Sequence, residues 1–128
     1  MIGSTRQVSV YAMARPVDMR KSFDTLAVLV TKELGRNMLS GDVFIFVGKT
    51  RRRAKALYWD GTGLCLFAKR LEQGRFAAPW DRTKEGSLRW TMSELSLFLE
   101  GSELVGRVPL SPAEWTPANR AAGAARVA

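Results

Sequence analysis

The chain has 128 residues, 46% hydrophobic and 25% charged, a composition typical of a soluble globular domain and unlike that of disordered or collagen-like chains. This length accommodates one hydrophobic core with a tail and excludes two full domains. The net charge is +8 and does not depend on pH near neutrality, because the chain has no histidine. A small protein this basic suggests a polyanionic partner, most often nucleic acid; the alternative is a charge that serves only solubility.

Several kinds of chemistry are excluded by residues that the chain lacks. Without histidine there is no Ser-His-Asp or Cys-His arrangement and no conventional zinc site, and the lone Cys65 cannot form an internal disulfide. No apolar stretch approaches the ~20 residues that span a bilayer. We therefore expect a cytoplasmic protein without a membrane association, catalytic residue, metal or cofactor.

Four aspartates leave a magnesium-dependent nuclease as an alternative, since phosphoryl chemistry needs clustered carboxylates. Three of them have a local explanation instead, which weakens the alternative: one suits a helix N-cap, one opens a strand and one opens a turn. The aspartates are Asp18, Asp24, Asp42 and Asp60.

The first predicted elements are a strand and a helix. Apolar residues alternate over residues 8–14, which indicates a strand that Pro16 ends. From Asp18 the spacing changes to that of an amphipathic helix, with Asp18 as its N-cap and Gly35 just past its end. The predicted apolar stripe comprises Met19, Phe23, Leu26, Val30 and Leu34.

The middle of the chain predicts an antiparallel meander of three strands, at residues 42–48, 54–60 and 64–70. In the first of these, Val43, Ile45 and Val47 alternate with Phe44 and Phe46, so both faces are apolar. A strand with two apolar faces is buried on both sides, and we expect it to lie in the centre of the sheet.

After the meander, residues 91–94 (TMSE) match a capping box and predict a short helix that runs to about Glu100 and ends at Gly101. Residues 110–128 are rich in alanine and proline, which favours a mobile tail, with Trp115 as a candidate docking residue. The sequence thus predicts an α+β fold in which a small meander packs with one long and one short helix. Residues 1–109 form its single domain and residues 110–128 its flexible tail.

The candidate binding site is the basic segment between the first two strands of the meander. It has no acidic residue between Asp42 and Asp60 to neutralise it locally. Guanidinium groups bind phosphate bidentately, and a hairpin can enter the major groove of DNA, so we expect phosphate contacts here; a solvated turn is the alternative. The residues are Lys49, Arg51, Arg52, Arg53 and Lys55.

Further basic residues flank this segment and extend the candidate site if the fold brings them together. Arg20 and Lys21 fall in the predicted first helical turn, and Lys69, Arg70 and Arg75 follow the third strand of the meander. Arg82, Lys84 and Arg89 come next in the chain. Residues 91–117 carry only one basic side chain against four acidic ones, which suggests that the two ends of the chain face different partners.

Three motifs together resemble a known family. They are P-x-D-M-R-K-x-F-D from Pro16, K-x-L-x-W-D-x-x-G from Lys55 and K-R-L-E-x-G-R-F from Lys69, followed by MSELSLFLEG at 92–101. In this order and spacing they are similar to the TnpB or second-open-reading-frame protein of bacterial insertion sequences of the sixty-six family. The resemblance covers about Val8 to Arg107.

This resemblance implies a non-catalytic accessory protein of transposition that works with a separate transposase, and with other accessory proteins of the element. The basic residues then suggest DNA, at or near the element's ends, as the ligand. A protein interaction module that docks on the transposase through its basic face is the alternative, and binding to single strands or RNA is a third reading. The acidic C-terminal helix, or the first helix, could hold the transposase or a second copy of the chain.

Overall fold

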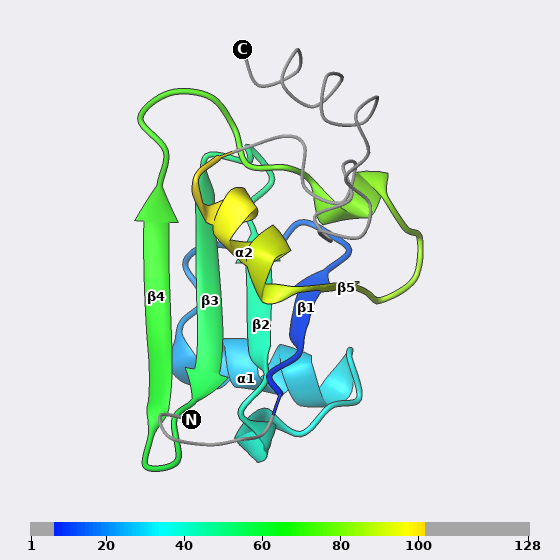
Figure 1. Ribbon diagram of the computed structural model, residues 1–128, viewed down its shortest axis with the longest axis vertical. Helices are drawn as coiled ribbons and strands as arrows, with labels where there is room; N and C mark the ends of the chain where they lie inside the picture. Colours follow the sequence, from blue (N-terminus) through cyan, green and yellow to red (C-terminus); the bar gives the residue numbers. More distant parts are fainter. Residues whose placement is uncertain (1–6, 102–128) are drawn as a thin grey trace, which may run out of the picture.

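A computed structural model describes residues 7–101, which form a five-stranded sheet with α1 (Phe23–Lys32) on one face and α2 (Met92–Leu99) on the other (Figure 1). The strands are β1 (Val10–Met13), β2 (Val43–Val47), β3 (Arg53–Trp59), β4 (Leu64–Arg70) and β5 (Ser87–Trp90). Short 3-10 turns lie at Met38–Ser40 and Pro79–Asp81. The α+β class is confirmed. No described helix is long and apolar enough to span a membrane.

The strand order is β4-β3-β2-β1-β5. The antiparallel meander β2-β3-β4 is as predicted. The predicted first strand, β1, joins it parallel to β2, with α1 in the connection, and β5 then pairs antiparallel to β1. β5 was not predicted, although its four residues alternate polar and apolar side chains in the order Ser87, Leu88, Arg89, Trp90.

The sheet carries an apolar core on each face. Val43, Ile45 and Val47 pack on the side of α2, against Leu95 and Phe98. Phe44 and Phe46 pack on the opposite side, against α1. Because β2 is fully buried and lies in the centre of the sheet, the prediction from its two apolar faces is confirmed.

The predicted start of the first helix is wrong. The N-cap is Ser22, whose amide donates to the Thr25 hydroxyl (2.9 Å), and the helix begins at Phe23. Asp18 instead accepts hydrogen bonds from the amide and guanidinium of Arg20. Arg20 and Lys21 therefore precede the helix, and Phe23, which the predicted stripe placed in the core, is 43% exposed. Asp18 satisfied the sequence rule for a cap, but its carboxylate caps a local turn.

The second helix follows its prediction. The Glu94 amide donates to the Thr91 hydroxyl (3.1 Å), and the Thr91 amide donates to the Glu94 carboxylate (3.0 Å). The helix ends at Leu99, and Gly101 follows with a φ of 86°, a left-handed angle that glycine adopts easily. The predicted tail and Trp115 lie outside the described residues.

Candidate nucleic-acid interface

The basic segment forms the turn between β2 and β3. A Cβ atom at Gly48 would lie 2.8 Å from the Met19 Cγ, so this position needs glycine or a shift of Met19. Arg51 has a φ of 64°, which is uncommon for a residue with a long side chain. The Arg51 amide donates to the Gly48 carbonyl (2.9 Å), and the Gly48 amide donates to the Arg53 carbonyl (3.0 Å). The turn is thus tight, and its backbone angle at Arg51 must be held by other contacts.

The loop that follows β4 supplies those contacts. The Phe76 amide donates to the Arg51 carbonyl (2.7 Å), and the Arg51 Nε donates to the Phe76 carbonyl (2.8 Å). The Leu71 amide donates to the Arg52 carbonyl (2.8 Å). Since Phe76 is fully buried, the turn is anchored to the core and does not project as a free two-stranded ribbon. Arg51 therefore helps to hold the turn in place, through its side chain and its carbonyl, whatever else it binds.

Four cations around this turn lack a local partner. Their side chains are exposed, and no hydrogen bond or ion pair engages them within residues 7–101. They therefore keep their full charge and their freedom to meet a ligand. They are Lys49, Arg52, Arg53 and Arg75.

Arg53 and Arg70 lie directly opposite each other on β3 and β4. Side chains at such positions are about 4.5–5.5 Å apart at Cβ, and like charges there repel. Glu72 forms an ion pair with Arg70 (3.1 Å), but both side chains are largely exposed, so water and salt weaken the pair. Within residues 7–101, Arg53 has no acidic partner. Together with Lys55 the two arginines line an open hollow of about 440 Å³, whose other lining residues are Met19, Ala54, Ala68, Lys69 and Glu72.

Two lysines near this hollow are held by backbone carbonyls. Lys55 Nζ donates to the Lys21 carbonyl (2.7 Å), which ties β3 to the segment before α1. Lys69 Nζ donates to the Leu99 carbonyl (2.6 Å), at the C-terminal end of α2, where a positive charge also complements the helix dipole. Carbonyl oxygens are uncharged, so both ammonium groups still contribute to the positive field.

Among the candidates, Arg20 has the shortest ion pair with an acidic side chain. Its guanidinium contacts both carboxylate oxygens of Asp18, the shortest distance being 2.7 Å. Hydrogen bonds from the Arg20 side chain and amide hold the pKa of Asp18 well below its usual range. Of the predicted contacts, Arg20 is therefore the least suited to bind phosphate.

The structure brings most of the predicted residues to one end of the sheet. There the turn after β2, the end of β4 and the loop that follows it lie together (Figure 1). Arg89 does not join them: it lies on β5, four strands from β4, or about 19 Å at the usual strand spacing. Within residues 7–101, no group of three or more histidine, cysteine or acidic side chains is placed to hold a metal ion.

Three aromatic residues with rings large enough to stack on bases, Tyr58, Trp59 and Trp80, are half-buried. Tyr58 and Trp80 pack against the core beneath α2, and burial raises the pKa of the Tyr58 hydroxyl. Trp59 is also half-buried, on the other face of β3. None of the three presents an open ring beside the basic turn, so their positions lend no support to single-strand binding through stacking.

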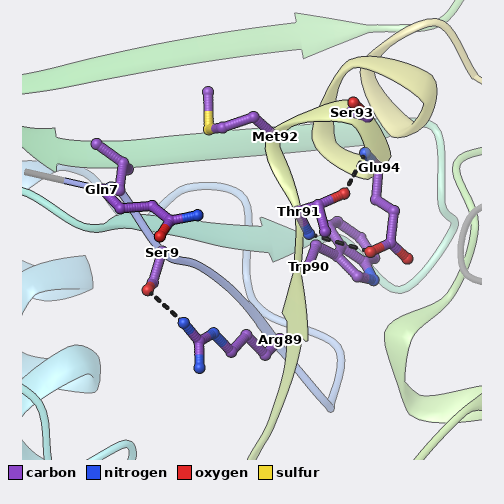
Figure 2. Close-up of a pocket in the computed structure, with 9 residues that line it drawn as sticks. Gln7, Ser9, Arg89, Trp90, Thr91, Met92, Ser93 and Glu94 are labelled. Carbon is purple, nitrogen blue, oxygen red and sulfur yellow. Dashed lines mark hydrogen bonds between the residues drawn. The ribbon is translucent and has the colours of Figure 1, made fainter. Parts of the chain in front are cut away.

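A second hollow, also of about 440 Å³, lies between the start of β1 and the start of α2. Figure 2 shows the Arg89 guanidinium donating to the Ser9 hydroxyl (3.0 Å) and the reciprocal capping bonds of Thr91 and Glu94. Within the described part of the chain, the buried Trp90 Nε1 has no hydrogen-bond partner. No local sequence pattern indicates this site, because it joins residues 80 positions apart.

The opposition of Arg53 and Arg70 was also missed, although its signal is in the sequence. The turn Asp60–Gly63 pairs Trp59 with Leu64, and counting outward from that pair sets Arg53 against Arg70. The Asp60 carboxylate fixes this turn by accepting from the amides of Thr62 and Gly63 (both 2.9 Å). These bonds lower the pKa of Asp60 to about 2.

The model of the family described as IS66 Orf2-like protein matches residues 8–107. The chain belongs to this family. It is also 37% identical over 101 residues to each of two uncharacterized proteins of Sinorhizobium fredii, y4jC and y4hO, covering 79% of this chain and 85% and 86% of theirs. No solved structure is detectably similar. The family fits an accessory protein of insertion-sequence transposition, as the sequence motifs implied.

Proposed function

We propose that this IS66 Orf2-like protein binds duplex DNA at or near the ends of its insertion sequence and acts there with a separate transposase and other accessory proteins. The observation that carries the proposal is the placement of Arg53 opposite Arg70. Arg52 and Lys49, which have no partner within residues 7–101, lie in the adjacent turn. Stability alone disfavours this arrangement, because like charges face each other across two strands. Phosphate oxygens would relieve the repulsion.

The surface also has the chemistry of a phosphate site. Arginine presents a planar fork that matches two phosphate oxygens, and the lysines beside it add point charges. About five such contacts would give a log-log slope of affinity against salt of about −4.5. The half-buried aromatics favour duplex over single-stranded DNA as the ligand.

The test is fluorescence anisotropy with a duplex that carries the element's terminal inverted repeat, compared with a scrambled duplex over a salt series. Arg52→Ala/Arg53→Ala removes two contacts and leaves the structural Arg51 in place. We expect the slope to fall by about 1.8 and binding at 0.15 M salt to weaken about thirtyfold. Lys84→Ala/Arg89→Ala removes the same charge at the β5 side and should change binding far less.

Equal losses in the two double variants would mean that only net charge matters and would reject this site. A native protein that fails to bind either duplex at physiological salt would favour the other candidate, a module whose basic face docks on an acidic surface of the transposase. That candidate draws on the same exposed cations, and pull-down with the transposase, repeated with both variants, would test it.

A further inference from the structure

β4 forms one edge of the sheet. Within residues 7–101 it pairs only with β3, and no described helix or strand lies beyond its outer side in Figure 1. Its seven residues span about 23 Å, and their outward amides and carbonyls can accept a further strand. The other edge, β5, has four residues and carries the exposed Arg89.

The middle of β4 lacks the features that normally protect an edge. Leu64 to Ala68 contain no proline, glycine or charged residue. The two cations of the strand lie at its end and not in its middle: Lys69 donates to the Leu99 carbonyl, and Arg70 forms an exposed ion pair with Glu72. Phe67, at the midpoint of the strand, is 46% exposed. An edge of this kind is suited to pair with another strand.

The sequence of β4 is complementary to itself when two copies run antiparallel about Phe67. Leu64 then faces Arg70 of the other copy, Cys65 faces Lys69, and Leu66 faces Ala68. No two cations are opposed. A parallel pairing in register would instead set Lys69 and Arg70 against their own counterparts, which is unfavourable.

The hydrogen-bonding pattern of the strand permits this register. The Leu71 amide donates inward to the Arg52 carbonyl, so alternation along an antiparallel ladder directs the amides of the even-numbered residues of β4 outward. Antiparallel pairing about Phe67 sets Leu66 against Ala68 and Leu64 against Arg70, all even-numbered, as hydrogen-bonded pairs. The two Phe67 residues form the closer, non-hydrogen-bonded pair.

We propose that a second copy of this chain pairs with β4, antiparallel and centred on Phe67, to give a continuous ten-stranded sheet. The two-fold axis is perpendicular to the sheet, so the same face of each copy lies on the same side. The Arg70 residues of the two copies are then six residues apart along the strands, or about 20 Å. The Arg53/Arg70 pairs of the two copies then lie on the same face, whereas the two 48–53 turns lie at opposite ends of the dimer. The dimer itself does not depend on DNA binding.

Cross-linking of the full-length chain without DNA tests the register. Phe67→Cys in a Cys65→Ser background should form a disulfide-linked dimer under mild oxidation, because the two sulfurs meet at the axis. The native Cys65 should not cross-link, since its two copies would lie about 13 Å apart along the strands. Val28→Cys in the same background is the matched control, because Val28 is equally exposed, at 48%, but lies on α1.

Sedimentation equilibrium tests the dimer itself. The native chain should dimerise with concentration, and Phe67→Lys, which opposes two ammonium groups, should weaken the dimer at least tenfold while Val28→Lys does not. A native monomer at all concentrations, a dimer indifferent to Phe67→Lys, or equal cross-linking from position 28 would overturn the proposal. If Phe67→Lys fails to fold, the cysteine series decides. Because no DNA is present, the result is independent of the proposed function.

Discussion

The two turns at the ends of β3 are built in opposite ways. Asp60–Gly63 holds itself, since the Asp60 carboxylate accepts from amides two and three residues away and Gly61 takes the left-handed angle. The turn 48–53 has an arginine at its left-handed position and depends on Phe76, 25 residues further along the chain. A turn that could have been stable by itself instead carries basic residues and needs remote support, which is the pattern expected where function selects the residues.

The largest expected effect comes from removing that remote support. Phe76 is fully buried and stacks on Phe98 with ring centroids 4.9 Å apart. Phe76→Ala should lower the free energy of unfolding by about 3–5 kcal/mol, because it leaves a cavity beneath the basic turn. Urea denaturation measures the loss. Thr62→Ala, in the self-contained turn, should cost under about 1 kcal/mol, and a similar cost for both would erase the contrast between the turns.

Two substitutions of Arg51 separate the contribution of its side chain to stability from the cost of its backbone angle. Arg51→Ala loses the bond from Nε to the Phe76 carbonyl and keeps the strained φ, so we expect a loss of about 1–2 kcal/mol. Arg51→Gly loses the same bond but adopts the angle freely, and should recover about 1 kcal/mol of it. Thermal unfolding of both variants measures the difference. An alanine variant as stable as the glycine variant would show that the turn is not strained.

The hydrogen bonds of Asp60 in the Asp60–Gly63 turn predict that the stability of the fold depends on pH. Its pKa is about 2 in the folded protein and near 4 in an unfolded chain, so its carboxylate stabilises the fold above about pH 4. This contribution is lost as the pH falls from about 4 through 2. Asp60→Asn lacks the titration, so the stability advantage of the native chain over this variant should shrink across that range. A constant difference between pH 5 and pH 2 would contradict the assigned bonds.

The same contrast explains how much the sequence could predict. Elements set by neighbouring residues were predicted, such as the capping box at Thr91 and Glu94 and the alternation of Val43 to Val47. Prediction failed where a side chain had two possible partners nearby. Asp18 met the rule for a helix cap, but its carboxylate instead accepts from Arg20, two residues further along the chain. The tie between Arg51 and Phe76 joins distant segments, and no local pattern reports such a contact.

For the candidate site, the sequence located the basic residues but did not show which of them have hydrogen-bond or ion-pair partners. Thirteen basic residues were named, yet the fold pairs Arg20 with Asp18 and Arg70 with Glu72 and gives Arg51 a backbone partner. Local charge counting cannot separate these from Arg52 and Arg53, which have no partner within residues 7–101. Only the register of the hairpin shows that Arg53 faces Arg70, and the register depends on where the turn at Asp60 closes.

A substitution at Arg53 has the smallest expected effect on stability, and it separates the requirements of the fold from those of DNA binding. Arg53→Glu replaces the repulsion with Arg70 by a cross-strand ion pair, and should raise the free energy of unfolding by about 0.2–1 kcal/mol. The same change puts a negative charge on the proposed DNA surface and should nearly abolish binding at physiological salt. Arg53→Gln, which removes the repulsion without adding an ion pair, should fall between the two in both measurements. A variant that is less stable than the native chain would show that Arg53 supports the fold, and the argument that the like-charged pair is kept for a phosphate ligand would fail.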